Sequence, residues 1–158
     1  MSPHAGQAPP HGAREPEHAT IADLSAIVEE LHEFWGERAR AALHHPLLVH
    51  EFGDTAFVIR GEDGRVLAYL FGLVTPRGVG YIHLVAVRDG HRREGYARAL
   101  YERFEAAARA LGARSLKAFT QLANTTSIAF HRSLGFTATD TPDYAGPGET
   151  RVVFTREL

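Results

Sequence analysis

The sequence predicts an α/β domain with a mixed sheet, because stretches with helical periodicity alternate with stretches that have the two-residue period of a strand. The strongest helical stretch covers residues 94–111, where apolar side chains recur at every third or fourth position: Ala97, Leu100, Tyr101, Phe104, Ala107, Ala108 and Leu111. Strands are indicated before it, at 81–87, and after it, at 115–120. Strands on both sides of a long helix are typical of the α/β class.

A proline-rich segment precedes this domain. Residues 1–18 contain four of the eight prolines and few side chains that are apolar enough to bury. We therefore expect a disordered tail over residues 1–18 and a single domain over residues 19–158.

The first half of the domain is expected to contain two helices and three strands. Helical spacing begins at Leu24, with Thr20 or Asp23 available as an N-cap. A second, short helix is expected over residues 37–43; it ends before Pro46, because a residue that precedes proline avoids helical backbone. Strands over 55–60 and 66–74 with a hairpin turn at 61–64, followed by the strand at 81–87, predict an antiparallel meander.

The second half continues from the long helix, which Gly112 is expected to end. The elements predicted after it are a strand over 115–120, a helix from Asn124 to Gly135, and strands over 136–139 and 151–155.

Composition narrows the classes of protein. The chain of 158 residues is long enough to bury roughly 68–70% of its unfolded surface, so it needs no disulfide or structural metal. It has no cysteine, which excludes thiolate metal sites and a cysteine nucleophile and is compatible with the cytoplasm, where we expect the protein. A net charge of −2 and the lack of an apolar run near ~18 residues argue against nucleic-acid and membrane partners.

The segment between the strand at 81–87 and the long helix indicates anion binding. The first amides of a helix have no partner within it, and the helix dipole adds roughly half a positive charge there. Gly95 would let a phosphate approach the backbone, and Arg92 and Arg93 could add charge-assisted hydrogen bonds. The alternative is that Gly95 only lets the helix pack closely on the sheet. The glycine spacing matches neither a Rossmann fingerprint nor a P-loop.

Two motifs in this region resemble the GNAT superfamily of acetyltransferases. Arg92-Arg93-Glu94-Gly95-Tyr96-Ala97 is similar to the family's Gln/Arg-x-x-Gly-x-Gly/Ala motif, and it follows an apolar strand as it does in the family. Residues 124–136, which open with Asn and end in Leu-Gly-Phe, resemble a later motif. The resemblance covers residues 21–158 and is strongest over 81–136. It implies a GNAT-like mixed, mostly antiparallel sheet flanked by helices on both faces, and transfer of an acetyl group from acetyl-CoA to an amine.

The resemblance also implies a set of cofactor contacts. The pantetheine arm would lie beside the strand at 84–87, a backbone amide near Val85 would polarise the thioester carbonyl, and the pyrophosphate would meet the amides after Val87. Asn124 matches the position that binds the pantetheine, although it is also an ordinary helix N-cap. The residues expected to bind acetyl-CoA are Leu84, Val85, Ala86, Val87, Arg92, Arg93, Glu94, Gly95, Tyr96, Ala97, Asn124 and Ser127. No metal is expected.

The expected catalytic residues are His131, His83 and Tyr81. His131 occupies the position where the family usually has a tyrosine near the thiol, and an imidazolium could donate the proton there; the alternative is a solvated helix histidine. His83 and Tyr81 share one strand face, where relatives have a base for the amine, although the glutamate common at the position of Tyr81 is missing. A histidine within an apolar strand is also compatible with a purely structural role.

The acceptor site is expected between the first helices and the last hairpin. Phe34, Trp35 and Tyr144 are candidates to flank the acceptor, and Asp143 and Glu149 could attract a cationic amine. The histidines at 44, 45 and 50 allow a metal site, but no carboxylate supports it.

The sequence leaves three alternatives for function. The first is an N-acetyltransferase that acts on a small-molecule amine, the second is one that acts on a peptide or protein, and the third is a noncatalytic module that binds acetyl-CoA. Whether the chain forms a homodimer also stays open.

Overall fold

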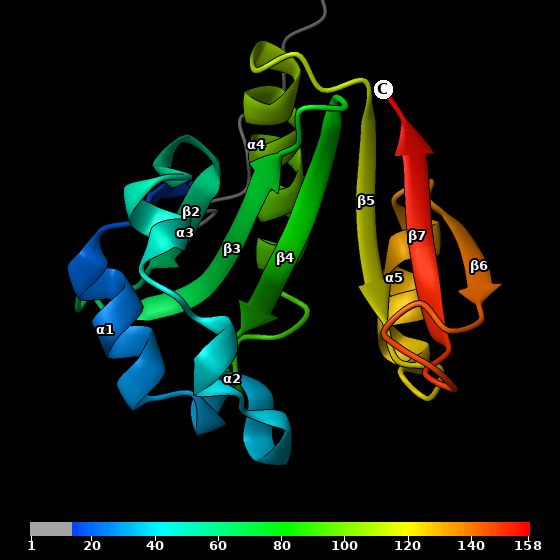
Figure 1. Ribbon diagram of the computed structural model, residues 1–158. Helices are drawn as coiled ribbons and strands as arrows, with labels where there is room; N and C mark the ends of the chain where they lie inside the picture. Colours follow the sequence, from blue (N-terminus) through cyan, green and yellow to red (C-terminus); the bar gives the residue numbers. More distant parts are fainter. Residues whose placement is uncertain (1–13) are drawn as a thin grey trace, which may run out of the picture.

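The computed structural model describes residues 14–158, which form a seven-stranded sheet with helices on both faces (Figure 1). The strands are β1 (Glu17–His18), β2 (Ala56–Arg60), β3 (Val66–Val74), β4 (Val79–Val87), β5 (Ser115–Thr120), β6 (Thr137–Thr141) and β7 (Arg151–Glu157). The α-helices are α1 (Ile21–Glu29), α2 (His32–Trp35), α3 (Leu47–His50), α4 (Tyr96–Ala110) and α5 (Thr125–Ser133), and the 3₁₀ turns are η1 (Gly36–Arg38), η2 (Ala41–Leu43) and η3 (Gly53–Thr55). Within this part of the chain, no helix is long and apolar enough to cross a membrane.

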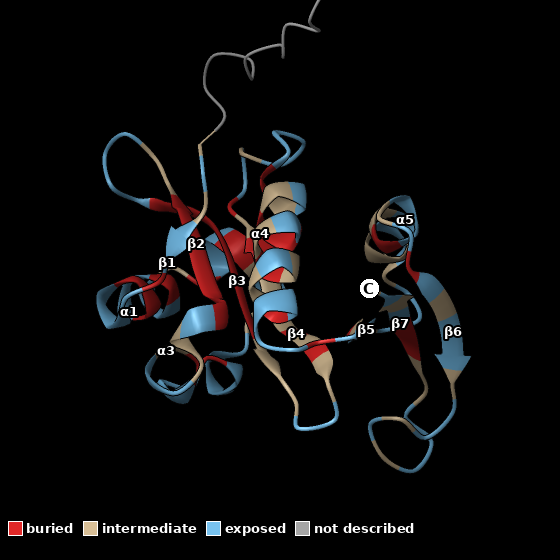
Figure 2. Cartoon of the chain, turned by 90° about the horizontal axis from the view of Figure 1, so that it is seen from above, coloured by how far each residue is buried: buried red, intermediate tan, exposed pale blue. Residues whose placement is uncertain are grey.

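The strand order is β1-β2-β3-β4-β5-β7-β6, and among the described residues the parallel pair is β4 with β5. All other neighbouring strands are antiparallel, which confirms the expected mixed, mostly antiparallel sheet. Helices α1, α2 and α3 bury one face, and α4 and α5 lie on the other (Figure 2). The sheet therefore separates two apolar cores.

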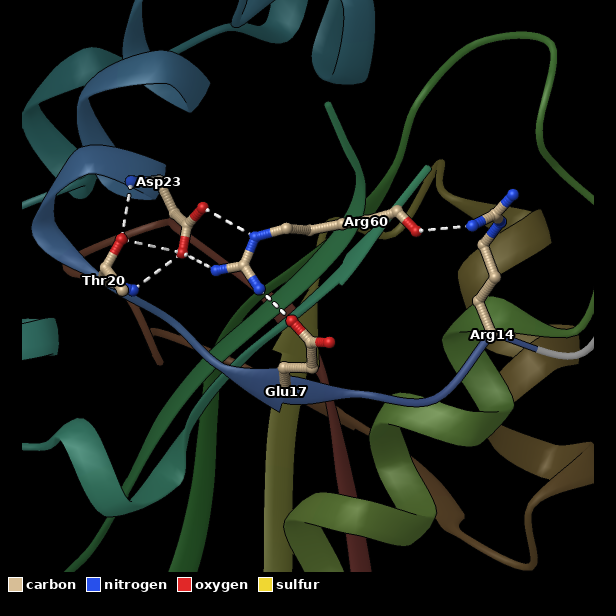
Figure 3. Close-up of polar contacts among 5 residues, drawn as sticks. All are labelled: Arg14, Glu17, Thr20, Asp23 and Arg60. Atoms are coloured by element: carbon tan, nitrogen blue, oxygen red, sulfur yellow. Dashed lines mark hydrogen bonds and ion pairs between the residues drawn. The ribbon is translucent and has the colours of Figure 1, made fainter. Parts of the chain in front are cut away.

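The segment that leads into α1 is held to the sheet. Glu17 and His18 pair with Val58 and Phe57 of β2, so the expected disordered tail extends too far at its C-terminal end. The reason is a polar network that the sequence did not reveal: Asp23 accepts a hydrogen bond from the Thr20 amide and pairs with Arg60, which also pairs with Glu17 (Figure 3). The remainder of the predicted tail, residues 1–13, lies outside the described residues.

The connection between α1 and β2 differs most from expectation. The single helix predicted over 37–43 is instead two separate turns, η1 and η2, because Arg40 between them has extended backbone. Neither turn contains a buried residue, so no apolar face stabilises a continuous helix there. Helix α3 was not predicted; it begins directly after Pro46, whose own backbone is helical.

The strand β3 and the elements of the second half agree closely with the prediction. β3 and β5 have the predicted boundaries, and Asn124 caps α5 by accepting a hydrogen bond from the Ser127 amide. Helix α4 begins two residues later than expected, because Gly95 adopts a left-handed conformation with φ of 83° and so cannot belong to the helix.

A β-bulge in β4 lies opposite Gly72. Phe71 pairs with Leu84 and Gly72 with Ile82, so His83 is the extra residue in the ladder. Ile82 packs in the core beneath α4, whereas Leu84 packs in the core beneath α1 and α2. The bulge therefore changes which residues of β4 face each core.

Gly72 is required by the close approach of α4 to this bulge. A Cβ atom at this position would lie 2.6 Å from the Phe104 ring and 2.6 Å from the Tyr81 carbonyl oxygen. We expect Gly72→Ala to lower the free energy of unfolding by about 1–3 kcal/mol, as overpacking of a core does. Gly53→Ala is the matched control, because a Cβ there meets no atom within 4 Å. Urea unfolding checks this, and equal midpoints for the two variants would contradict the packing argument.

Candidate functional site

A cleft opens where β4 and β5 part. Over residues 14–158 the ladder between these strands contains three residue pairs, from Val79 with Ser115 to Tyr81 with Lys117 (Figure 1). Beyond the last pair lies a cleft of about 800 Å³. Its walls include Phe34 and Trp35 from one face of the sheet and Tyr101 and His131 from the other. The opening in the sheet therefore joins its two faces.

The N-terminus of α4 presents free backbone amides to this cleft. In the described residues, no backbone or side-chain acceptor bonds to the amides of residues 92–98, and Arg93, Gly95 and Ala97 line the cleft. Arg93 and Gly95 both have left-handed backbone, with φ of 65° and 83°. Alternation with left-handed residues gathers successive amides into a concave anion site. Holding the non-glycine Arg93 in this conformation costs about 1–2 kcal/mol, so the strain is concentrated at the anion site.

The charge around these amides is positive. Arg92, Arg93 and Arg98 line the cleft, whereas Glu94 does not; its carboxylate lies 3.4 Å from Nδ1 of His91. Free amides, a helix N-terminus and three guanidinium groups are suited to a diphosphate. The residues present therefore fit the phosphates of a coenzyme A thioester.

Most of the predicted cofactor-binding residues line this one cleft. They are Leu84, Val85, Ala86, Val87, Arg92, Arg93, Gly95, Tyr96, Ala97, Asn124 and Ser127, with Glu94 as the exception. The Tyr96 side chain is buried in the core beneath α4, so its backbone is the part available to a ligand. Asn124 uses its side chain within the protein: Oδ1 accepts from the Ser127 amide at 3.2 Å, and Nδ2 donates to Thr120 at 3.0 Å.

His131 is buried, so the alternative of a solvated helix histidine is wrong. Its Nδ1 lies 2.8 Å from the Ser127 carbonyl oxygen, so Nδ1 carries the hydrogen. Nε2 then accepts from the Tyr101 hydroxyl at 2.6 Å, and the ring stacks on Phe154 at 3.9 Å. Burial lowers the pKa of His131, and the Ser127 carbonyl offsets this only in part. Tyr101 and His131 thus form a buried hydrogen-bonded pair in the wall of the cleft.

His83 is oriented by the segment that covers the sheet. Its Nε2 lies 3.0 Å from the Leu43 carbonyl oxygen, so Nε2 carries the hydrogen and Nδ1 of the neutral ring keeps a lone pair. His83 lines the cleft. His44, which follows Leu43 in the chain, anchors η2. Its Nε2 lies 2.8 Å from the buried Tyr69 hydroxyl, and its Nδ1 lies 3.0 Å from the Arg40 carbonyl oxygen. The His83 ring is thus held at the opening in the sheet by its contact with Leu43.

Tyr81 and Tyr144 lie beside the cleft without lining it. Burial raises the pKa of Tyr81 to about 12, so its hydroxyl stays protonated at neutral pH and is unsuited to act as a base. The Tyr81 ring lies 6.4 Å from the His83 ring and 6.5 Å from the Phe119 ring, and Phe119 contacts Tyr144 at 5.1 Å. Together Tyr81, Phe119 and Tyr144 form an aromatic shelf next to His83.

The histidines at 44, 45 and 50 are not arranged as a metal site. Both ring nitrogens of His44 are engaged with Tyr69 and Arg40, and Nδ1 of His45 accepts from the Leu47 amide at 3.1 Å. Among residues 14–158, no group of three or more metal-binding side chains is close enough to hold an ion.

Sequence reasoning missed several residues that line the cleft, among them Tyr101, Arg38 and Phe119. Tyr101 was treated as part of the apolar stripe of the long helix, although a buried tyrosine needs a partner for its hydroxyl, and this is the signal that could have revealed it. Arg38 and Phe119 line the cleft because the chain folds its distant segments together. No local pattern marks either one.

Comparisons with known proteins agree with this geometry. Three solved structures illustrate the likeness in fold. A GNAT-family protein from Desulfovibrio desulfuricans has a TM-score of 0.73 at 20% identity, and the match covers 92% of this chain and 99% of that protein. yncA from Salmonella typhimurium, solved with its cofactor acetyl-CoA, has a TM-score of 0.71 at 23% identity, covering 93% and 95%. A ribosomal-protein-alanine N-acetyltransferase from Brucella melitensis has a TM-score of 0.67 at 25% identity, covering 90% and 99%. No curated protein matches the chain.

The family comparison is more specific than the structural one. The model of the acetyltransferase (GNAT) family matches residues 22–136, which contain both motifs, β4, β5 and the cleft between them. Because this match spans most of the chain and its positions coincide with the anion site, the chain belongs to the acetyltransferase (GNAT) family.

Proposed function

We propose that the protein transfers the acetyl group of acetyl-CoA directly to the amine of a small molecule. One observation carries the proposal: the free amides of residues 92–98 open into the same cleft as His83 and His131. A single cleft can thus hold the phosphates of the acyl donor, a base and a proton donor. Acetyl-CoA would supply the acetyl group as a thioester.

The residues along β4 would hold and polarise the thioester. Beyond Tyr81, the β4 edge that faces the cleft has no strand pairing to β5, so its backbone groups are available to the pantetheine arm. A backbone amide near Val85 would stabilise the negative charge that develops on the carbonyl oxygen. Val85 lines the cleft and packs against the core beneath α4, which fixes this part of the strand.

His83 would accept the proton of the amine. An alkylammonium with a pKa near 10 is protonated at neutral pH, and reaching the neutral amine costs roughly 4 kcal/mol. The lone pair at Nδ1 of His83 is the acceptor that the Leu43 contact leaves available. His83 would take one proton from the ammonium before the attack and release it to solvent, and it would accept the second proton as nitrogen bonds to the carbonyl carbon and the carbon–sulfur bond breaks.

The Tyr101–His131 pair would protonate the departing sulfur. His131 is neutral at rest, so it would first take up a proton from solvent at Nε2. That proton can then pass to the Tyr101 oxygen while the hydroxyl proton passes to sulfur, which leaves both residues neutral. Burial lowers the pKa of His131, so its protonated form gives up this proton more readily than an ordinary imidazolium. A thiolate is a moderately good leaving group, so this step assists the reaction without being indispensable.

The alternatives are a protein N-acetyltransferase and a noncatalytic acetyl-CoA-binding module. The structural neighbour from Brucella melitensis is named for acetylation of a ribosomal protein, which supports a protein N-acetyltransferase as an alternative. The second would need the anion site but neither His83 nor the Tyr101–His131 pair. Their presence in the same cleft favours turnover.

The decisive experiment measures binding and turnover separately. We expect acetyl-CoA at about millimolar concentration to raise the melting temperature, because a ligand that binds only the folded state stabilises it. We expect thiol release from acetyl-CoA with members of a panel of small amines and peptides. Stabilisation without thiol release would favour the noncatalytic module, and release with peptides alone would favour a protein acceptor. The absence of both stabilisation and release would overturn the proposal.

Replacement of Gly95 tests the anion site. Gly95→Leu would place a side chain at the free amides and is expected to raise the acetyl-CoA dissociation constant by about tenfold or more. Gly90→Leu is the matched control, because Gly90 has a similar φ of 85° and an equally open surrounding but does not line the cleft. Calorimetric titration checks this, and equal affinities of the two variants would refute the phosphate assignment.

Replacement of the two histidines tests the chemistry. His83→Gln keeps a donor for the Leu43 carbonyl but loses the basic nitrogen, so turnover should fall by roughly 10²-fold or more at unchanged acetyl-CoA affinity.

Replacement of His131 tests the proposed proton donor. His131→Phe should lower turnover more than acetyl-CoA affinity, and Tyr101→Phe should reproduce its effect if the two residues act as a pair. Steady-state kinetics and titration of each variant give the comparison; unaltered turnover in either histidine variant would remove that residue from the mechanism.

A further inference from the structure

We propose that the acceptor amine also carries an anionic group, such as the carboxylate of an amino acid, and that Lys117 binds this group beside the aromatic shelf. The inference rests on the proposed function and specifies its substrate class. Its three supports are the charge of the cleft, the position of Lys117 and the shape of the shelf.

The cleft is lined by positive and neutral side chains. Its titratable lining consists of four arginines, three histidines and two tyrosines, without an aspartate or glutamate among the described residues. The arginines at 92, 93 and 98 surround the anion site, but Arg38 lies at the other wall, with its guanidinium 6.0 Å from the Trp35 ring. A polycationic acceptor would meet repulsion here, whereas an anionic group would be attracted.

The two carboxylates expected to attract a cationic amine are engaged elsewhere. Asp143 Oδ1 accepts a hydrogen bond from the Gly148 amide at 2.7 Å, which closes the loop between β6 and β7. Glu149 pairs with Arg151 at 2.9 Å. Neither residue lines the cleft. The sequence expectation of a carboxylate subsite is therefore not supported by their positions.

Lys117 is the only lysine of the chain. Like Tyr81 and Tyr144, it lies beside the cleft and does not line it. It pairs with Tyr81 in the last step of the ladder before the sheet opens, and Tyr81 is two residues from His83. Its ammonium lies 5.2 Å from the Tyr144 ring, and none of the ion pairs formed by residues 14–158 includes it. A partly buried cation without an acidic partner is suited to bind an anionic ligand.

The aromatic shelf connects Lys117 to His83. Phe119 is 40% exposed, and its ring lies between Tyr81 at 6.5 Å and Tyr144 at 5.1 Å. An exposed aromatic surface between a base and a cation fits a compact molecule with an amine, an apolar side chain and a carboxylate. An apolar or aromatic amino acid has these three groups, and a polyamine does not.

The test uses acceptors that differ only in charge. Phenylalanine, tyrosine and methionine are each compared with their carboxamides, with spermidine and a basic peptide as cationic probes, in the thiol-release assay. We expect kcat/KM for each amino acid to exceed that for its amide by about tenfold, the gain of one charge-assisted contact. Lys117→Met should bring the ratio close to one while keeping activity on the amides, and Lys117→Arg should preserve it.

Arg77→Met is the matched control, because Arg77 is an exposed cation in the turn between β3 and β4, before the first pair of the β4–β5 ladder, whereas Lys117 belongs to the last pair. It should leave the ratio unchanged. Equal rates for acids and amides, a preference for spermidine or the peptide, or an unaltered ratio in Lys117→Met would each overturn the inference while the proposed transfer stands. Inactivity with every acceptor would overturn both, and stabilisation by acetyl-CoA would then show whether the cofactor part survives.

Discussion

The cleft depends on one feature of the sheet: the hydrogen-bonded ladder between β4 and β5 stops after three residue pairs. Within the described chain the two strands pair from Val79 to Tyr81 and then separate, although each continues for several residues. A strand edge buried without partners is unfavourable, because backbone amides and carbonyls need hydrogen bonds. The backbone groups on this edge of β4 therefore need hydrogen bonds from either solvent or an extended ligand. An arm with amide groups, such as pantetheine, can pair with such an edge in the way that an added strand does.

Two local features let β4 serve both faces of the sheet. The bulge at His83 sends Ile82 towards α4 and Leu84 towards α1, so the strand contributes to both cores within three residues. Gly72 opposite the bulge lets the Phe104 ring approach, which ties α4 to the strand. As a result the left-handed turn before α4 lies between two packed elements, β4 and α4. Because both are packed, the amides of this turn keep their orientation.

The parts predicted from the sequence are those with a local cause. β3 and β5 were recognised from their apolar runs, and the turn before α4 was recognised because a helix start after a strand has free amides whatever surrounds it. The parts that escaped depend on distant partners. β1 exists because Arg60, more than 40 residues away, pairs with Glu17. The pKa of His131 is lowered by burial, to which the stacked Phe154 ring contributes, and no spacing rule encodes this. Asp143 and Glu149 looked available because their loop and ion-pair partners could not be foreseen.

The acceptor wall is the region where sequence patterns were weakest, yet a buried polar chain fixes it. Trp35 donates to the Tyr69 hydroxyl at 2.6 Å, and that hydroxyl donates to Nε2 of His44 because Nδ1 holds the hydrogen directed at the Arg40 carbonyl. Every donor and acceptor in this chain is used, and burial lowers the pKa of His44, which favours the neutral ring that the arrangement requires. Because Leu43 immediately precedes His44, the carbonyl that orients His83 is fixed by the core of the protein. The segment between α2 and α3 thus has little regular secondary structure but a defined position, and that position sets which ring nitrogen of His83 meets the Leu43 carbonyl oxygen.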